Sequence, residues 1–434
     1  MIYMEGGAWC TSPSECLERS KGWLGDVYSR PRRAYFDGML ENNKTYNPDF
    51  YNWNRVYIVY CDGSSFLGDV EEVDPQTNVT YRGSRVFDAV IEDLFAKGLN
   101  NAENVILSGS SAGALATILN CDTFSARLPN AKRVKCLSDS GFFLHATNLP
   151  GAKEREDYFT QVVNLHGLEK FLPASCTSKR NPGQCLFPEY LVEDIQTPLF
   201  ILESSFDYHQ LREMLTPYIG GGYDEWHDCI YNLTLCNSTQ IGIFQEFQQT
   251  FINTLQNLKF SASRGMYVHN CYLHTHIYLK SESVCSAVGK NTLENKSVAE
   301  AIGDWYFDRR SFRDIDTVDH HKLKSKLTCV CVCFTQPKYT KSTATSTNAP
   351  PIAIRHEWWL AVSCLSSPTP PPCDLNACDS ETQSPPTLYG FIPVSIPTAL
   401  LPSCRRRLAA DSAAVPPASE NSGSAARSTF SVEP

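Results

Sequence analysis

Short apolar runs alternate with amphipathic segments over the first 315 residues of the chain. Residues 56–60, Val-Tyr-Ile-Val-Tyr, are β-branched or aromatic and run into Asp62-Gly63, which predicts a buried strand. Residues 86–98 carry apolar side chains at positions 86, 87, 90, 91, 94 and 95 and stop at Gly98, which predicts a helix. The remaining predicted elements are a strand that already includes Met1, strands at 105–107, 134–137 and 198–202, and a helix at 112–119.

Strands that alternate with helices are typical of a mostly parallel sheet covered by helices on both faces. We therefore expect an α/β fold. Residues 150–190 and 215–265 are more helical and carry cysteines, so we interpret them as insertions that shape a substrate cleft.

The composition changes near residue 318. Residues 319–434 hold 15 of the 26 prolines and seven of the 18 cysteines, and they show no sustained helix or strand period. Proline clusters and Ser/Thr/Ala tracts of this kind cannot bury enough apolar surface to fold. We predict a folded domain over residues 1–318 and a low-complexity, disordered tail over residues 319–434.

The charge balance excludes some classes of partner. The formal net charge is −9, of which the tail carries +2 and the body −11. This balance argues against a nucleic-acid binder. The absence of any apolar run of 18 residues predicts no membrane span. We expect a monomer.

The cysteines indicate an oxidising compartment and disulfide bonds. Five N-x-[ST] sequons agree with secretion, at Asn43, Asn78, Asn232, Asn237 and Asn295. Zinc binding is the alternative, with Cys329, Cys331 and Cys333 as the nearest candidates. No C-x-x-C pair is followed by a second pair, so we expect no metal.

The body has 11 cysteines, an odd number, so at least one has no partner within it. We pair Cys10 with Cys16 because they lie close together in the sequence. No signal peptide precedes the first predicted strand. We expect a secreted protein whose signal peptide and first strands are missing from this chain.

Residues 109–113, Gly-Ser-Ser-Ala-Gly, fit the G-x-S-x-G pattern, with Ser111 at its centre. A predicted strand precedes the motif and a predicted helix follows it. A sharp strand-to-helix turn needs very small residues beside the serine and leaves its hydroxyl exposed. We interpret Ser111 as a nucleophile. The alternative is an ordinary turn built from small residues.

A nucleophilic serine needs a base and an acid that orients the base, in the order Ser, acid, His for α/β-hydrolases. Asp207 directly follows the predicted strand at 198–202 and is the preferred acid, with Glu203 and Asp194 as rivals. The candidates for the base are His227, His269, His274, His276, His320 and His321, and position alone leaves His269, His274 and His276 tied.

An oxyanion hole needs backbone N–H groups that point at the developing charge. The N–H of Ala112, directly after the nucleophile, is the first candidate. Residues 5–10, Glu-Gly-Gly-Ala-Trp-Cys, follow the first strand and offer Gly7 and Ala8. The alternative is an ordinary Gly-Gly turn.

Seven stretches, taken together and in this order, resemble the pectin acetylesterase family of plants, which also contains the animal Wnt-deacylating esterase Notum. They cover roughly residues 1–315 and are residues 5–10, 60–69 (Tyr-Cys-Asp-Gly-Ser-Ser-Phe-Leu-Gly-Asp), 107–113, 138–143 (Ser-Asp-Ser-Gly-Phe-Phe), 203–210, 270–276 (Asn-Cys-Tyr-Leu-His-Thr-His) and 303–308 (Gly-Asp-Trp-Tyr-Phe-Asp).

The resemblance implies an α/β-hydrolase-like fold and a role for each candidate. The family's base lies in a Cys-aromatic-x-His motif, which matches His274. Asp207 matches the acid, Ser111 the nucleophile, and Gly7, Ala8 and Ala112 the oxyanion donors. The family's third loop glycine is Ala8 here. Alanine keeps its N–H, so we expect the hole to be preserved if this position does not need a positive φ.

The resemblance also implies a secreted carbohydrate O-acetylesterase that acts on acetylated pectin of the cell wall through an acetyl-enzyme, without metal or cofactor. The alternatives are a Notum-like deacylase of a longer acyl chain and a catalytically inactive, truncated carbohydrate-binding remnant. Trp9, Phe66, Phe142 and Phe143 are candidates for the acyl pocket or for sugar stacking, with core packing as the alternative. Candidates for a basic groove that attracts pectin are Arg32, Arg33, Arg82 and Arg85.

Overall fold

The computed structural model describes residues 1–26, 36–220, 222–277, 293, 296–317, 332–337 and 358–363. Several candidates lie outside the described residues, namely Arg32, Arg33, His320, His321, Cys329, Cys331 and Asn295.

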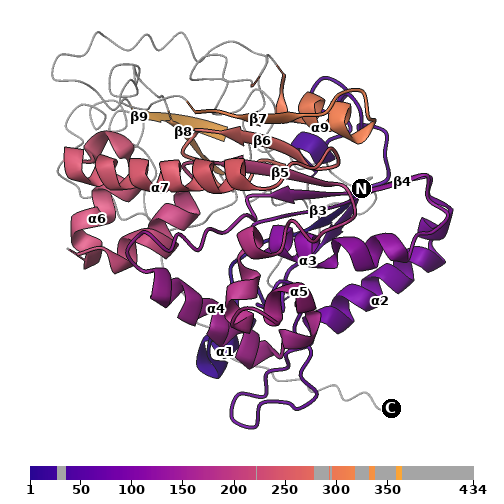
Figure 1. Ribbon diagram of the computed structural model, residues 1–434, viewed down its shortest axis with the longest axis horizontal. Coiled ribbons are helices and arrows are strands. Elements are labelled where there is room, and N and C mark those ends of the chain that lie inside the picture. Colours follow the sequence, from indigo (N-terminus) through magenta and orange to yellow (C-terminus); the bar gives the residue numbers. More distant parts are fainter. Residues whose placement is uncertain are drawn as a thin grey trace, which may run out of the picture. The chain divides into compact units, whose positions relative to one another are not determined.

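A seven-stranded sheet in the order β2-β1-β3-β4-β5-β6-β7 organises the body (Figure 1). Every neighbouring pair of strands in it is parallel. The strands are β1 (Ile2–Met4), β2 (Val56–Ile58), β3 (Asn104–Ser110), β4 (Arg133–Asp139), β5 (Leu199–Ser204), β6 (Gly265–His269) and β7 (Arg313–Ile315). The predicted α/β fold with a mostly parallel sheet is confirmed.

Alternate residues of the central strands enter two separate cores, as the pleat of a strand requires. In β5, Leu199 and Ile201 pack into one core, whereas Phe200 and Leu202 pack into the other. All four side chains are buried. Both faces of the sheet are therefore covered, which explains why the strands read as continuous apolar runs.

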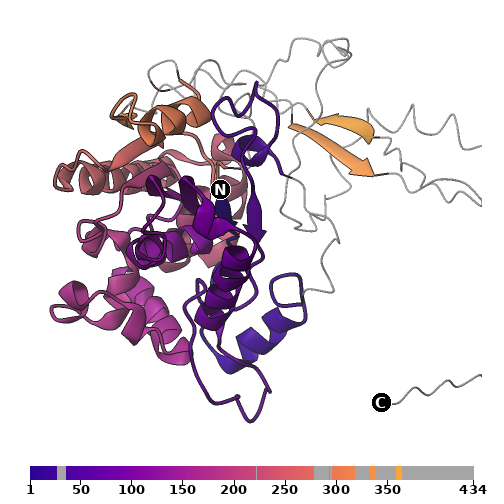
Figure 2. The ribbon, with the colours of Figure 1, turned by 90° about the vertical axis from the view of Figure 1, so that its right-hand side faces the viewer.

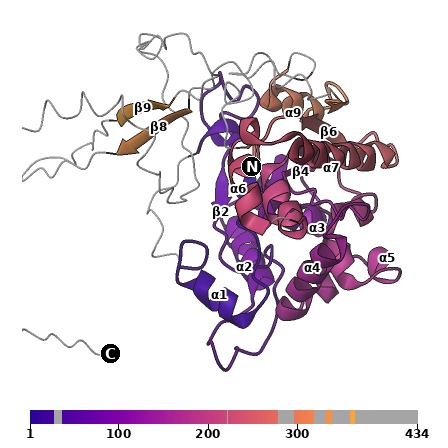
Figure 3. The same cartoon turned by 90° about the vertical axis from the view of Figure 1, so that its left-hand side faces the viewer.

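The two cores are covered by different helices. The larger core takes buried residues from α2, α3, α4, α6 and α7, and the smaller core takes them from α9 and from residues 39–50. Accordingly, α9 and α4 lie on opposite sides in Figure 1 and in the turned views of Figures 2 and 3. The helices are α1 (Pro13–Ser20), α2 (Gly83–Ala96), α3 (Ala112–Ala126), α4 (Ala152–His166), α5 (Ala174–Thr177), α6 (Gly222–Tyr231), α7 (Ser238–Asn257) and α9 (Val298–Tyr306).

The predicted elements are present, with two differences. The strand predicted at 56–60 is β2, but it lies at the edge of the sheet, so Val56 and Tyr57 are only half-buried. Strands β6 and β7 were not predicted, and they complete the sheet beyond β5. The predicted insertions at 150–190 and 215–265 contain α4 to α7.

Within residues 319–434 the structure describes an antiparallel pair, β8 (Val332–Pro337) and β9 (Trp358–Ser363). The disorder of this tail and the domain boundary at residue 318 stay predictions. Among the described helices, none is long and apolar enough to cross a bilayer.

Four disulfides link described residues, and the predicted Cys10–Cys16 pair is one of them. The other three are Cys121–Cys136, Cys176–Cys185 and Cys229–Cys236. The Cys121–Cys136 bond joins α3 to β4, and both residues are fully buried. It therefore fixes the helix that follows the candidate nucleophile to the neighbouring strand.

Replacing Cys121 and Cys136 together by alanine is expected to lower the free energy of unfolding by about 3 kcal/mol, because a disulfide that closes a loop of this size restricts the unfolded chain. Urea denaturation measures this difference. An unchanged midpoint would show that packing alone fixes α3 to β4.

Candidate functional site

The turn from β3 to α3 places Ser111 in a strained conformation, with φ 57° and ψ −125°. A Cβ atom on Gly109 would lie 2.2 Å from the carbonyl oxygen of Gly113. A Cβ atom on Gly113 would lie 2.2 Å from the carbonyl oxygen of Met4 in β1. Neither position can therefore carry a side chain. The glycines of the G-x-S-x-G motif are explained by this close approach of three backbone segments.

The loop of residues 5–10 lies against the same turn. A Cβ atom on Gly6 would lie 2.7 Å from the Cβ of Ser111. The carbonyl of Gly7 accepts a hydrogen bond from Arg19 Nη1 (2.7 Å), and the carbonyl of Ala8 accepts one from the Tyr60 hydroxyl (2.8 Å). A trans peptide points its N–H opposite to its C=O, so the N–H of Ala8 is turned away from Arg19.

The three candidate oxyanion donors are not used elsewhere. Within the described part of the chain, the N–H groups of Gly7, Ala8 and Ala112 donate no backbone hydrogen bond. Ala112 is the first residue of α3, where an N–H has no partner inside the helix. All three groups are therefore available to an anionic oxygen.

Ala8 differs from the expectation, because it has a φ of 53°. The position that carries glycine in the family pattern therefore does adopt the left-handed conformation. Alanine tolerates this conformation at a cost of roughly 1–2 kcal/mol. Hydrogen bonds to the carbonyls of Gly7 and Ala8 hold the loop in place, and the disulfide between Cys10 and Cys16 fixes its end.

Asp207 and His274 form a direct pair. The distance from His274 Nδ1 to Asp207 Oδ2 is 2.6 Å. Asp207 is fully buried just after β5, and its other oxygen accepts a hydrogen bond from the N–H of Gln210 (2.9 Å). A histidine whose Nδ1 proton is held by a carboxylate presents Nε2 as a base.

The rival acids have other surroundings. Glu203 is fully buried in β5, where its Oε1 accepts a hydrogen bond from the N–H of Phe142 (2.7 Å) and its Oε2 has no partner. Burial, followed by the negative charge of Asp207, raises the pKa of Glu203 well above its usual value. Its surroundings therefore favour the protonated, neutral form of Glu203. Asp194 is exposed and accepts a hydrogen bond from Ser175.

The geometry also separates the tied histidines. His269 and His276 contact each other through their Nε2 atoms (2.5 Å), and His276 Nδ1 lies 2.5 Å from Asp139. The exposed His227 lies beside Asp228. Among the described histidines, His274 is the one that pairs with Asp207.

No hydrogen bond joins Ser111 to His274 among the described side chains, but both are anchored to the end of β4. The N–H of Ser111 donates to the carbonyl of Asp139 (2.8 Å), and the N–H of Thr275 donates to Ser140 Oγ (2.8 Å). Catalytic hydrogen bonds are often long before substrate binds. Ser111 and His274 therefore flank one short segment of β4.

His209, which the sequence did not single out, stacks on His274 with ring centres 4.8 Å apart. Burial, followed by the positive charge of His274, lowers the pKa of His209 to about 3. His209 is therefore a neutral ring beside the candidate base. The spacing Asp207-Tyr-His was visible in the sequence, but it gave no indication of ring stacking.

The four candidate aromatic residues, Trp9, Phe66, Phe142 and Phe143, are at most 4% exposed. The Trp9 ring meets Phe143 edge-on at 5.0 Å, and its Nε1 donates to Ser65 Oγ. This burial favours core packing over stacking on a sugar ring. Phe143 also contacts His209, with ring centres 6.5 Å apart, so it lies two rings away from His274.

The basic candidates Arg82 and Arg85 have acidic or carbonyl partners. Arg85 forms ion pairs with Asp69 and Glu71, and Arg82 donates to the carbonyl of Glu71. Hydrogen bonds from Lys170 and then Arg85 lower the pKa of Asp69. The predicted basic groove stays a prediction.

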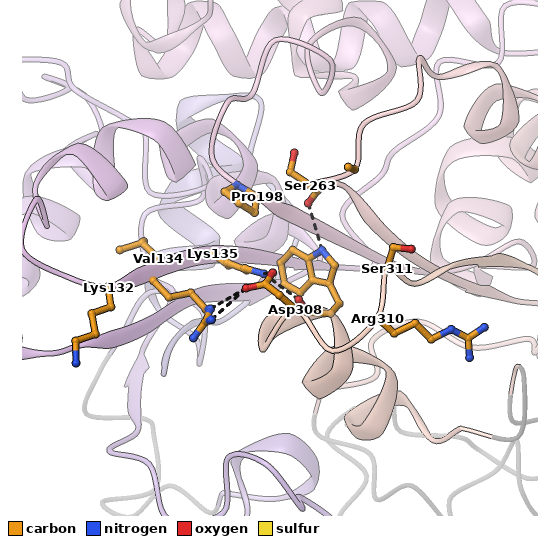
Figure 4. A pocket seen from close by; sticks show the side chains of 11 residues that line it. Lys132, Val134, Lys135, Pro198, Ser263, Asp308, Arg310 and Ser311 are labelled. Carbon is orange, nitrogen blue, oxygen red and sulfur yellow. Dashed lines mark hydrogen bonds and ion pairs between the residues drawn. The ribbon is translucent and has the colours of Figure 1, made fainter.

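A pocket of about 500 Å³ lies at the end of the sheet opposite to the candidate catalytic residues (Figure 4). It includes Arg133 at the start of β4 and Pro198 just before β5, so it faces the amino ends of the strands. Asp308 bonds there to both Arg133 and Lys135. The candidate catalytic residues follow the carboxyl ends of the strands, where ligands of parallel sheets usually bind.

Cys10, Cys16 and His166 are close enough together to hold a metal ion. The disulfide between the two cysteines leaves no thiolate for a metal. In this oxidised form the group is a structural one.

The chain is similar to known proteins over most of its length. Residues 1–329 match the family model described as Pectinacetylesterase. Pectin acetylesterase 11 from Arabidopsis thaliana is 40% identical over 316 residues, which cover 73% of this chain and 80% of the relative. Pectin acetylesterase 7 from the same plant is 42% identical with the same coverage.

More distant proteins share the fold. Palmitoleoyl-protein carboxylesterase NOTUM from Schmidtea mediterranea is 26% identical over 322 residues, covering 70% of this chain and 56% of the relative. The solved structure of the Wnt deacylase Notum from Drosophila aligns with a TM-score of 0.60 at 24% identity, covering 73% of this chain and 87% of that chain.

Replacing Ala8 by glycine is expected to raise the free energy of unfolding by about 0.5–1 kcal/mol. The relief of left-handed strain exceeds the added entropy of the unfolded chain. Thermal unfolding measures the change. Ala146→Gly is the matched control, since Ala146 has a similar φ of 51° outside the site. A loss of stability in Ala8→Gly alone would show that the Ala8 methyl group packs favourably.

Glu203→Gln is expected to change how stability depends on pH. A carboxyl whose pKa is raised by folding stabilises the protein fully at pH values below its unfolded pKa, which is near 4.5. This stabilisation is lost as the pH rises through the pKa of the folded state. Above pH 4.5 the free energy of unfolding of the variant, relative to that of the wild type, should therefore rise by about 1.4 kcal/mol per pH unit until the pH reaches the pKa of the folded state. Urea denaturation across this range, with the exposed Glu213→Gln as control, tests this. Parallel curves would mean that Glu203 is ionised.

Proposed function

Because this chain belongs to the pectinacetylesterase family, we propose that it is a serine carbohydrate O-acetylesterase that hydrolyses acetyl esters of cell-wall pectin. The family makes the chain an esterase. The serine mechanism, the acetyl group and the pectin substrate are the proposal. The observation that carries it is the buried Asp207–His274 pair, anchored to the same end of β4 as the strained Ser111.

The reaction follows from these positions. His274 Nε2 takes the proton of Ser111 Oγ as this oxygen attacks the acetyl carbonyl carbon. Asp207 holds the imidazolium that forms, and the N–H groups of Gly7, Ala8 and Ala112 receive the oxyanion. The C–O bond to the sugar then breaks, and His274 returns the proton to the sugar oxygen.

Water completes the cycle. His274 takes a proton from water, the hydroxide attacks the acetyl-serine, the bond to Ser111 Oγ breaks, and His274 returns the proton to Ser111 Oγ. The products are acetate and free enzyme. None of these reaction steps requires a residue to change its redox state or to bind a metal. Phe143, next to His209, is the candidate wall of the acyl pocket.

The proposed location is the extracellular cell wall, which is supported by the four disulfides and by the plant relatives. Among the predicted glycosylation sites, Asn43, Asn78 and Asn237 are exposed. The proposed partner is acetylated pectin, bound by a monomer.

Ser111→Ala is expected to abolish hydrolysis of p-nitrophenyl acetate, with kcat falling by about 10⁴-fold or more, because removal of one member of a triad disables the unit. Asp207→Asn should lower kcat by about 10⁴-fold, since the His274 tautomer is no longer held. His227→Gln, at an exposed histidine, is the control. Activity that survives in folded Ser111→Ala protein would refute the nucleophile.

Two measurements test the proposed substrate. The first compares the hydrolysis rates of an acetyl ester and an octanoyl ester, and the second follows the release of acetate from acetylated pectin. A preference for the octanoyl ester would favour a Notum-like deacylase. A folded wild-type protein that hydrolyses neither ester would instead support an inactive carbohydrate-binding remnant.

A further inference from the structure

A second chain of hydrogen bonds lies beside the Asp207–His274 pair. His269 contacts His276 between their Nε2 atoms, and His276 Nδ1 contacts Asp139 Oδ1, both at 2.5 Å. The hydroxyl of Ser110 donates to the other oxygen of Asp139, also at 2.5 Å. All four side chains are at most 4% exposed, so water cannot replace these bonds. The mechanism proposed above uses none of them.

The bonding pattern assigns the protons in this chain. The N–H of Cys271 donates to His269 Nδ1 (3.0 Å), so Nδ1 carries no proton and His269 is protonated on Nε2. His269 therefore donates to His276 Nε2, which leaves the proton of His276 on Nδ1, where it bonds to Asp139. Both rings are neutral in this arrangement. Burial lowers the pKa of His269 well below its usual value, which agrees with a neutral ring.

Asp139 is the anion at the end of the chain. Burial favours its neutral form, but the hydrogen bonds from His276, followed by the bond from Ser110, keep the pKa of Asp139 below its usual value. Its Oδ2 also accepts the N–H groups of His276 (2.8 Å) and Ile277 (2.9 Å). A buried carboxylate with this number of donors has a fixed orientation.

Asp139 also connects the two halves of the candidate site. Its backbone carbonyl holds the N–H of Ser111, and its carboxylate holds the backbone two and three residues after His274. Ser140 adds a bond to the N–H of Thr275 between them. The position of His274 relative to Ser111 therefore depends on Asp139, and the orientation of Asp139 depends on His276.

We propose that Asp139 and His276 are positioning residues that set the distance between His274 and Ser111. This inference rests on the proposed function for its kinetic consequence, but its structural part can be measured without turnover. A displacement of about 1 Å in a reacting group can lower the rate by about 10²-fold.

The test compares two substitutions at His276. Glutamine presents one donor and one acceptor on a planar group and can bond to Asp139 and His269, whereas leucine fills the space without either bond. His276→Gln is expected to keep kcat for p-nitrophenyl acetate within about threefold of the wild type. His276→Leu is expected to lower kcat by about 10²-fold with little change in KM, because the base is displaced and the substrate contacts remain.

His145→Leu is the matched control for the loss of a buried histidine. His145 is 4% exposed and bonds to Tyr190, away from the candidate site. This control should lose thermal stability and keep kcat. Assays are run below the midpoint of the least stable variant, so that the kcat values compare folded proteins. The inference is wrong if His276→Leu keeps the wild-type kcat. It is also wrong if kcat falls as far in His276→Gln as in His276→Leu.

Amide hydrogen exchange reports on the positions without catalysis. The amides of Thr275, His276 and Ile277 should be protected in the wild type and in His276→Gln, and should exchange at least tenfold faster in His276→Leu. Wild-type protein without esterase activity but with this exchange pattern would refute the proposed function alone. Unchanged exchange in His276→Leu of an active enzyme would refute the positioning role alone.

Discussion

The candidate site depends on the close approach of the end of β1 to the turn between β3 and α3. A methyl group on Gly113 would overlap the carbonyl oxygen of Met4, at 2.2 Å, and one on Gly6 would overlap the Cβ of Ser111, at 2.7 Å. This contact places the loop of residues 5–10 beside Ser111, so the two groups of candidate oxyanion donors converge. Strand pairing of β1 with β3 provides the register, because Met4 is opposite Gly109. A side chain at either glycine would separate the donors from the serine.

Three buried carboxyl groups, those of Asp139, Glu203 and Asp207, lie where β4 and β5 end, and their surroundings differ. Hydrogen-bond donors around Asp139 lower its pKa, whereas burial and the negative charge of Asp207 raise the pKa of Glu203. Asp207 accepts from His274 and Gln210. Negative charges this close together repel one another, so the raised pKa of Glu203 reduces the repulsion at Asp207, the partner of His274.

The sequence predicted the features that depend on local spacing. The Gly109–Gly113 motif, the acid after a strand and the alternation of strands with helices all follow from short-range rules, and the resemblance then resolved the choice of His274. The network of Asp139, His276 and His269 could not be predicted, because its members come from the end of β4, the end of β6 and the segment after β6. The quoted Ser138-Asp-Ser-Gly stretch indicated family membership but no role for Asp139. The sequence left open whether Ala8 has a positive φ, because local preference gives alanine a negative φ and only the family's glycine at this position indicated otherwise.

Backbone strain is concentrated where this network and the candidate site meet. Nine described residues other than glycine have a positive φ, and four of them are Ala8, Ser111, Ser140 and Thr275. Such conformations cost roughly 1–3 kcal/mol each and persist only where the surroundings hold them. Hydrogen bonds hold them: the Tyr60 hydroxyl donates to the Ala8 carbonyl, the Ser111 N–H donates to the Asp139 carbonyl, and the Thr275 N–H donates to Ser140 Oγ. Because strained residues and buried hydrogen bonds occupy the same few positions, the fold trades stability for a fixed geometry there. That fixed geometry is what an oxyanion hole requires, since its donors must be aligned before the charge develops.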